Sequence, residues 1–329
     1  MNYNPAFRIE ANGKDITAQL AEYFVGLTHT DSAGVESDSL TITLANPDGV
    51  IRLPATGAEL RLWLGYANAA VYKGLFVVDK VTVKGPPEQL VIKANGAPFK
   101  RSGTFSALHS QKRRSWKPCK IGDLVATIAG EHGLTPAVKE SLAGVTLQHL
   151  DQIDESDINL LTRVAAQHGA IAKANGGKLM FVPQAAGESA SGKTLPTVSL
   201  KPGDTSTWQA DISGRQNFSS VVAVWRDMDA TTDREEKAGS GEPVYRLKQN
   251  FPTQAAAQKA ARATLERFMR GSATLSLSMP GRPDLVAESR LSLVGFAKGV
   301  AGTWSVTQVT NSLSPSGYKT SVKGEVPLS

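Results

Sequence analysis

Two distant stretches of the 329-residue chain repeat one pattern of residues. RLWLG begins at Arg61 and RLSLVG at Arg290, and each is followed by a ten-residue segment that begins with glycine, at 74–83 and at 302–311. The aligned segments share four identical pairs: Gly74 and Gly302, Val78 and Val306, Val81 and Val309, and Thr82 and Thr310. β-Proteins reuse these residue types by chance, but the shared spacing favours duplication. The chain is therefore predicted to contain two similar β-barrels.

Two further matches extend this repeat. Phe76 aligns with Trp304, and Gly96 follows Gly74 by the same 22 residues that separate Gly324 from Gly302. Alternation along a strand places each aromatic ring on the same face as the valine two residues later. Phe76 and Trp304 are therefore predicted to occupy equivalent places in the two barrels.

The first barrel is predicted over residues 1–105. Alternating or apolar runs separated by turn residues predict strands; they lie at 7–11, 40–44, 60–64, 75–83 and 90–94. The fold class is accordingly mainly β.

Residues 106–185 are predicted to form an α/β insertion domain with two helices, at 121–133 and 157–168. Acidic residues and His168 gather around the second helix, which invites an acid/base or metal site. However, Asp157 and His168 lie at opposite helix ends, about 16 Å apart at 1.5 Å per residue. Ser156 or Asp154 is instead expected to cap the N-terminus, and a histidine followed by glycine ends each helix.

The second barrel is predicted over residues 186–329, with one long helix. Strands resume at 221–225, and the polar, glycine-containing stretch 231–243 predicts a mobile loop. The helix is expected to begin after Thr253 and to end at Gly271, with one apolar stripe of Ala257, Ala261, Leu265 and Phe268. The remaining runs predict strands.

The segment GESASGKT, 187–194, matches the phosphate-binding pattern GxxxxGK[ST]. That pattern requires a helix directly after the loop, so that amides and the helix N-terminus meet the phosphates. Pro196 and the strand-like TVSL at 197–200 follow instead. A flexible Gly/Ser/Ala loop is therefore preferred over a nucleotide site, and no cofactor is expected.

Composition excludes several other site types. Cys119 is the only cysteine, which excludes a disulfide and a cysteine-rich zinc site, and the five histidines show no metal-binding spacing. No serine lies in a GxSxG turn, so no catalytic or metal residue is assigned. No signal peptide or membrane span is evident, and we expect folding in a cytoplasm.

The chain has a net charge of +6 and a pI of about 9.3. Binding to nucleic acid, binding to an acidic partner and solubility are all open as explanations of this positive charge. The basic segment QKRRSWKPCK opens the insertion domain. A nucleic-acid contact, a solvated loop and a subunit contact are its alternatives. We take it as a candidate partner-contact segment consisting of Lys112, Arg113, Arg114, Trp116 and Lys117.

Three stretches together resemble the late control protein D family of contractile phage tails, and more distantly the N-terminal part of the type VI secretion spike protein VgrG. They are SWKPCKIGDLVATIAGEHGL at 115–134, QIDESDINLLTRVAAQHGA at 152–170 and GTWSVTQVTNSLSPSGYKTSVKGE at 302–325. The resemblance covers nearly the whole chain. One departure is Asn311, where relatives often carry histidine.

The resemblance implies a noncatalytic baseplate hub. In that family three subunits, each with two barrels similar to the tail-tube protein, surround a channel between a sixfold tube and a threefold spike. It implies as partners the chain itself as a homotrimer, the tail tube protein, a separate central spike protein and other baseplate proteins, with the tape measure protein as a further candidate.

The resemblance places the chain in the host cytoplasm during assembly and then in the baseplate of a phage, a prophage or a tail-like bacteriocin (tailocin). The alternatives are a tail-associated enzyme, either a cell-wall hydrolase that uses the acids at 154–157 or an NTPase that uses GESASGKT, and a nucleic-acid-binding protein.

Overall fold

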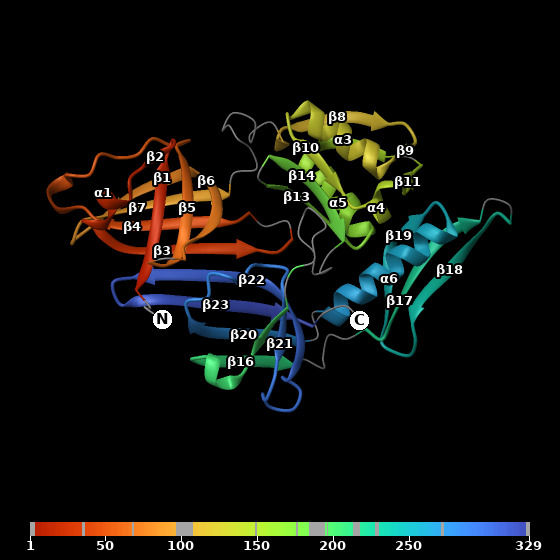
Figure 1. Cartoon of the computed structure of the whole chain (residues 1–329). Helices are drawn as coiled ribbons and strands as arrows, with labels where there is room; N and C mark the ends of the chain where they lie inside the picture. The colour runs from red at the N-terminus through yellow and green to blue at the C-terminus, as the bar shows by residue number, and fades with distance from the viewer. Residues whose placement is uncertain are drawn as a thin grey trace.

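The structure is a computed structural model of the whole chain. It describes residues 4–34, 37–67, 69–96, 108–148, 150–175, 177–183, 195, 197–212, 218–227, 230–270 and 273–326. The described residues are mainly in β-strands, which confirms the predicted fold class (Figure 1). Across these ranges, no helix combines the length and apolar character that crossing a bilayer requires.

The N-terminal elements form the first β unit. They are β1 (Pro5–Ala11), β2 (Lys14–Asp15), α1 (Thr17–Ala21), β3 (Phe24–Ser32), β4 (Ser39–Ala45), η1 (Pro47–Gly49), β5 (Glu59–Tyr66), β6 (Val71–Lys84) and β7 (Gln89–Gly96). All five strands predicted here are present, each within a slightly longer element.

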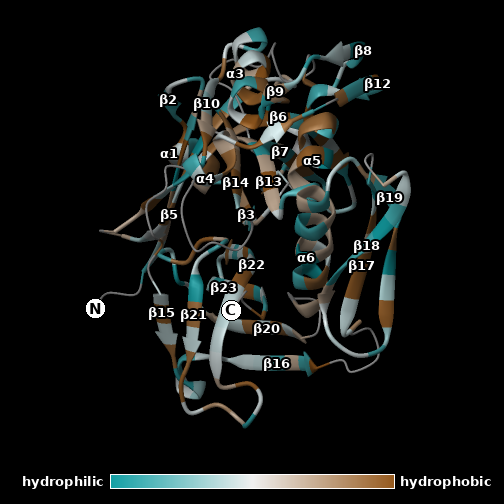
Figure 2. Cartoon of the chain, turned by 90° about the vertical axis from the view of Figure 1, so that its right-hand side faces the viewer, coloured by the Kyte–Doolittle hydropathy of each residue, from teal (hydrophilic) through white to brown (hydrophobic). Residues whose placement is uncertain are grey.

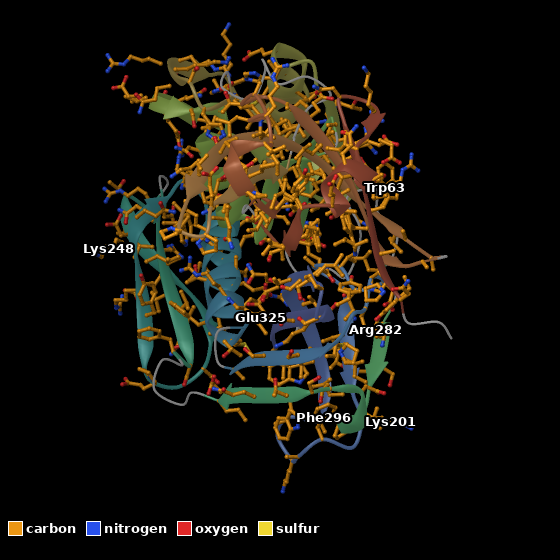
Figure 3. The ribbon with its side chains drawn as sticks, turned by 90° about the vertical axis from the view of Figure 1, so that its left-hand side faces the viewer. Trp63, Lys201, Lys248, Arg282, Phe296 and Glu325 are labelled. Atoms are coloured by element: carbon orange, nitrogen blue, oxygen red, sulfur yellow. The ribbon has the colours of Figure 1, made fainter. Side chains whose placement is uncertain are left out.

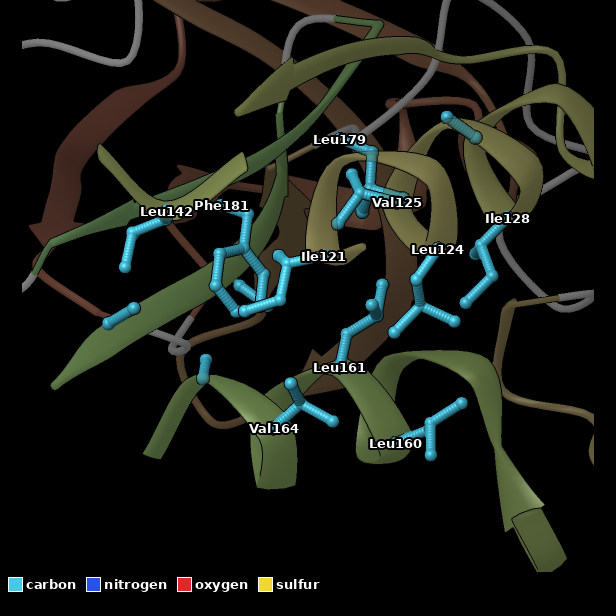
Figure 4. Close-up of a cluster of buried hydrophobic side chains, with 14 of the residues drawn as sticks. Ile121, Leu124, Val125, Ile128, Leu142, Leu160, Leu161, Val164, Leu179 and Phe181 are labelled. Atoms are coloured by element: carbon cyan, nitrogen blue, oxygen red, sulfur yellow. The ribbon is translucent and has the colours of Figure 1, made fainter. Parts of the chain in front are cut away.

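The middle domain follows, and both predicted helices are present in it. Its elements are β8 (Gln111–Trp116), β9 (Cys119–Lys120), α3 (Ile121–Glu131), β10 (Thr135–Val138), α4 (Glu140–Ala143), β11 (Thr146–Leu147), β12 (Leu150–Ser156), α5 (Asp157–Gln167), β13 (Ala170–Asn175) and β14 (Lys178–Pro183). Apolar side chains of α3 and α5 face each other and Phe181 of β14 in one core (Figure 4).

The C-terminal part contains the second β unit and a small helix–sheet unit. The second β unit consists of β15 (Thr197–Leu200), η3 (Pro202–Asp204), β16 (Thr207–Ile212), β20 (Ala273–Pro280), β21 (Arg290–Leu293), β22 (Gly302–Ser314) and β23 (Gly317–Glu325). The helix–sheet unit consists of β17 (Ser220–Asp227), β18 (Thr232–Gly239), β19 (Val244–Phe251) and α6 (Gln254–Arg270).

One expectation for this part is confirmed and one is wrong. Thr253 caps α6, because its Oγ1 accepts the Ala256 N–H at 3.2 Å, and α6 packs along β17, β18 and β19 (Figure 2). The stretch 231–243 is not a loop, since residues 232–239 form strand β18, paired with β17. GESASGKT lies outside the described residues, but TVSL after it forms strand β15, as predicted.

The two β units share one sheet. Among the described residues the strand order is β16-β20-β23-β22-β3-β4-β7-β6-β5-β1-β2; in addition, β21 pairs with β22 and β15 pairs with β21. Strand β3 pairs with β4 on one side and with β22 on the other, and this pairing connects the units (Figure 1). Each unit keeps its own apolar core, one containing Phe76 and the other Trp304.

The repeat predicted from the sequence has the same strand pairing in both units. β5, β6 and β7 pair in succession, as do β21, β22 and β23. Gly74, the fourth residue of β6, and Gly302, the first residue of β22, have positive φ angles of 137° and 132°, which favour glycine. The ladder slips between Val78 and Lys80 in one unit and between Val306 and Gln308 in the other, so both units carry a β-bulge at the same aligned position.

Two details of the predicted alignment are wrong. Val306 pairs with Gly324, whereas Val78 pairs with Ala94, so Gly96 does not match Gly324. This mismatch arises because the two hairpin turns differ in length. β22 and β23 join through a tight turn after Ser314, whereas the β6–β7 turn is longer. Trp304 pairs with Leu291 and Phe76 pairs with Leu60, so Leu291 and Leu60 occupy equivalent positions. Arg290 is therefore equivalent to the residue two positions before Arg61, and the two arginines do not match.

Candidate functional site

Asp157, the first residue of α5, is the centre of a buried ionic cluster in the middle domain. Its side chain is fully buried and contacts three basic residues: Lys112 Nζ at 2.6 Å, Arg114 Nη2 at 2.8 Å and His132 Nε2 at 2.7 Å. Gln152 Nε2 donates to it at 2.8 Å. Burial acts to raise the pKa of Asp157, but these hydrogen bonds and the Arg114 charge outweigh it and lower that pKa.

The strand geometry of β8 explains how the cations reach this carboxylate. Side chains alternate along a strand, so Lys112 and Arg114 point to the same face, toward α3 and α5. There they also bind the two carboxylate oxygens of Glu131, at 2.8 and 2.6 Å. The Arg114 guanidinium lies 4.3 Å from the Trp116 ring centroid, a cation–π contact beside the middle-domain core.

The predicted partner-contact segment therefore divides into two faces. Lys112, Arg114 and Trp116 make the internal contacts just described, whereas Arg113 and Lys117 are exposed. Arg113 pairs with Asp154, and both side chains are mostly exposed. A partner would meet mainly Arg113 and Lys117, and the role of the segment in partner contact stays a prediction.

The ionic cluster has the donor atoms of a metal site but not the electrostatics of one. Glu131, His132 and Asp157 place one ligand atom each within 4.8 Å of one another. The Lys112 and Arg114 cations already occupy the same carboxylate oxygens, so a metal ion would meet two positive charges. The burial of both His132 and Asp157 also keeps a substrate away from this pair. We conclude that the cluster joins β8, α3, β12 and α5.

The helix ends are as the sequence indicated. Ser156 caps α5, because its Oγ accepts the Asn159 N–H at 3.4 Å, and Asp154 instead has a positive φ of 49° and binds Arg113. His132 and His168 end their helices. Burial, with the nearby Lys259 charge, lowers the pKa of His168 to about 4.

Cys119 is a partly buried thiol without features of a nucleophile. Burial, and then the charge of Asp123, raises its pKa, whereas a reactive cysteine has a lowered pKa.

A buried polar network lies at the seam between the two β units, where β3 pairs with β22. Asn311 Oδ1 accepts hydrogen bonds from Tyr318 Oη at 2.8 Å and Thr320 Oγ1 at 2.9 Å. On the other side of the seam, His29 lies opposite Asn311, with its Nδ1 3.5 Å from Asn311 Nδ2. Asn311 thus contributes polar contacts at the position where a departure from the family pattern was noted.

The same seam anchors the middle domain. Lys173 of β13 donates to the Ser32 carbonyl and to Asp38, both at 2.9 Å, and the lysine and aspartate side chains are largely buried. Asp31 accepts the Ala287 N–H at 2.9 Å, and burial and then the Asp38 charge raise its pKa. Polar groups from all three parts of the chain therefore meet at one junction.

The buried His29 at this seam is expected to make the folded protein less stable in acid. Burial, and then the Lys73 charge, lowers the pKa of His29 to about 3, from about 6.5 in an unfolded chain. The unfolded chain therefore takes up a proton that the folded chain refuses, and stability falls as the pH drops from about 6.5 toward 3. By pH 4.5 the loss from His29 is about 2–3 kcal/mol.

Urea unfolding of the parent and of His29→Gln between pH 7 and pH 4.5 measures this pH-dependent loss of stability. The variant is expected to show a smaller pH-dependent loss than the parent. His109→Gln, which changes an exposed histidine, is the matched control for replacing a histidine by glutamine. Equal slopes for the parent and His29→Gln would remove His29 as the cause.

Comparisons with known proteins agree with this fold. The profile of the phage tail baseplate hub (GPD) family matches residues 105–316. A probable baseplate hub protein of Escherichia phage 186 is 33% identical over 99% of this chain and 94% of its own length.

Two solved structures have a similar fold. The 43 kDa tail protein of prophage MuSo2 from Shewanella oneidensis has a TM-score of 0.75 at 14% identity, over 98% of this chain and 99% of that chain. The E. coli c3393 protein, a component of the type VI secretion system, has a TM-score of 0.58 at 12% identity, over 98% of this chain and 77% of that one.

Proposed function

The chain belongs to the phage tail baseplate hub family, and we propose that three copies form a ring that joins the sixfold tail tube to a threefold central spike. Membership of this family makes the chain a component of the tail baseplate. The trimer, the tube and the spike are the parts that the proposal adds.

The paired β units are the observation that supports this role. Each chain contains two units with the same strand succession, a glycine of positive φ at the same aligned position and the same bulge position. Three such chains present six similar units, which approximates the symmetry of a six-membered tube ring. A chain with one unit would need six copies and could not also match a threefold spike without a further adaptor.

The proposed partners are the tail tube protein above the ring and a spike protein below it, with other baseplate proteins at the periphery. The middle domain offers Arg113 and Lys117 as exposed cations for such a contact. Assembly in the host cytoplasm, and use in a phage, a prophage or a tailocin, complete the proposal.

The proposed role requires no catalysis. The acids that suggested a hydrolase form structural contacts: Asp157 binds Lys112 and Arg114, Glu155 binds Arg163, and Asp154 binds Arg113. Binding energy in a hub of this kind comes from broad interfaces rather than from a pocket.

Light scattering of the chain with its spike protein tests the trimer. The hub component should approach three times 34.9 kDa, or about 105 kDa, beyond the mass of the spike. A stable dimer or tetramer on the spike would contradict the proposal. A monomer that becomes trimeric only with spike would support it and would show that the spike drives assembly.

A further inference from the structure

The middle domain packs as a body of its own. Its apolar core consists of side chains from residues between 108 and 181 alone (Figure 1). In the described ranges, no apolar cluster combines side chains of the middle domain with those of a β unit or of the helix–sheet unit. Domains that meet without a large apolar interface are expected to move relative to one another.

The two β units are joined to each other in a different way. Strands β3 and β22 pair directly, and Leu313 and Tyr318 of the second unit pack in the apolar core of the first. Backbone pairing and a shared core hold the two units together. A motion of the middle domain is therefore expected relative to both β units at once.

Lys173 of β13 is the cation that connects the middle domain to the β units. By strand alternation it shares one face of β13 with Ile171, which is buried but belongs to none of the apolar clusters. Lys173 Nζ donates to the Ser32 carbonyl and to Asp38. Only 12% of the lysine side chain and 14% of the aspartate side chain are exposed. Breaking so buried a pair costs far more than breaking a surface pair.

This lysine also balances further carboxylates at the junction. Burial has the largest effect on Asp31 and Glu288 and raises the pKa of both, and the Lys173 charge acts against that rise. Lys73 is the other cation that acts on Asp31. Without Lys173, the three carboxylates Asp31, Asp38 and Glu288 would therefore repel one another more strongly.

The backbone beside this junction is strained. Glu288 has a positive φ of 67°, which is unfavourable for a residue other than glycine. Its Oε1 accepts the Gly34 N–H at 3.3 Å, and its own N–H donates to the Val306 carbonyl at 2.8 Å. Such strain persists only where the surroundings fix the backbone, and it gathers at sites that change conformation.

A second contact of the middle domain lies where α5 meets α6 (Figure 2). Small residues make it, since a Cβ added at Gly169 would lie 3.7 Å from the Cβ of Ala263. His168 lies close to Lys259 there, and its pKa of about 4 keeps it uncharged at neutral pH. This contact therefore consists of close packing rather than charge attraction, which suits a pivot.

We propose that the Lys173–Asp38 pair is a latch, and that breaking it lets the middle domain move as a rigid body about the α5–α6 contact. The β3–β22 pairing takes no part in this motion, so the β units keep their arrangement while the middle domain changes position. The inference goes beyond the joining role proposed above and does not depend on it, because latch and pivot lie within one chain.

Distances between spin labels on the full chain test this inference. The labels replace Lys117 in the middle domain and Lys84 in the first β unit, both exposed, and Cys119→Ser removes the native thiol. Unlabelled chain is added in excess so that distances between copies do not contribute. The parent should give one distance, whereas Lys173→Met should lower the ratio of closed to open chains on the order of 100-fold.

Two further variants grade the effect. Lys173→Glu places a fourth carboxylate beside Asp31, Asp38 and Glu288 and should be mostly open. Asp38→Asn combined with Lys173→Met should open no further than Lys173→Met alone, because both substitutions break one pair.

The matched controls change charge elsewhere. Lys178→Glu lies on β14 of the same domain, and Lys248→Glu lies on β19, where Figure 3 labels the residue; both lysines are exposed. Both controls should keep the parent distance. A second label pair, at Lys84 and at the exposed Lys298 of the second β unit, should keep its distance in every variant.

Hydrogen exchange of the same variants separates motion from unfolding. In a rigid-body motion, the amides of α3 and α5 keep their parent exchange rates while the label distance changes. Faster exchange of these helices in Lys173→Met would overturn the inference, because the domain would then unfold rather than move. An unchanged distance in Lys173→Glu, or additive opening by Asp38→Asn and Lys173→Met, would overturn it as well.

Discussion

Replacing Asp157 by alanine is expected to lower the free energy of unfolding by about 3–5 kcal/mol. The substitution leaves the Lys112 and Arg114 cations, each about 30% exposed, with only Glu131 as counter-charge. It also removes the carboxylate that His132 contacts and one of the two acceptors of Gln152 Nε2, which keeps the Glu155 carbonyl. Removing one partner of a buried ion pair costs more than the pair contributes, because the remaining charges stay poorly solvated. Urea denaturation followed by circular dichroism measures the change.

Asp154→Asn is the matched control for this prediction. Asp154 lies three residues away and also binds an arginine, but both partners are mostly exposed, and asparagine tolerates the positive φ of this position, so the loss should stay within about 0.5 kcal/mol. A similar small loss for Asp157→Ala would show that the cluster does not hold the middle domain together.

Truncating either repeated aromatic residue is expected to cost about 3–5 kcal/mol, by Phe76→Ala in one unit and by Trp304→Ala in the other. Both rings are buried, at 1% and 4% exposure, and each packs in the core of its own unit. Trp304→Ala also removes the hydrogen bond from Nε1 to the Val300 carbonyl, 2.8 Å long. Differential scanning calorimetry or urea denaturation of each variant measures the loss.

Trp208 provides the comparison for these truncations. It lies on the edge strand β16 with 41% of its surface exposed, so Trp208→Ala should cost less than half as much as Trp304→Ala. If only one of Phe76 and Trp304 proved costly to truncate, the two units would not be energetically equivalent, and the interpretation of the repeat would fail.

The elements that sequence patterns predicted well are those with one apolar stripe. α3 and α5 appeared where helical periodicity and a following His-Gly placed them, and in β4 and β7 every second residue is buried between partly buried or exposed neighbours. Strand β18 was missed because the charged run from Arg234 to Lys237 does not alternate with apolar residues. Its pairing with β17, with ion pairs such as Arg226 to Asp233, supports it instead.

The ionic cluster could not be predicted because its members are far apart in sequence. His132 and Asp157 are 25 residues apart and Lys112 and Asp157 are 45 apart. The packing of α3 with α5 brings His132 to Asp157, and the pairing of β8 with β12 brings Lys112 there. The one available signal was the spacing of Lys112 and Arg114, which places two cations on one face of a strand. The match of Gly96 with Gly324 was wrong because the lengths of the β6–β7 and β22–β23 turns, and not the residue types, decide which positions of the two hairpins are equivalent.

Electron microscopy of the chain assembled with its tube and spike proteins tests the hub proposal most directly. Averages viewed along the tail axis should show three copies around one channel, with the units that contain Phe76 and Trp304 alternating at one level to give six similar densities. Two, four or six copies, or β units at different levels along the axis, would contradict the proposal that this chain matches a sixfold tube to a threefold spike.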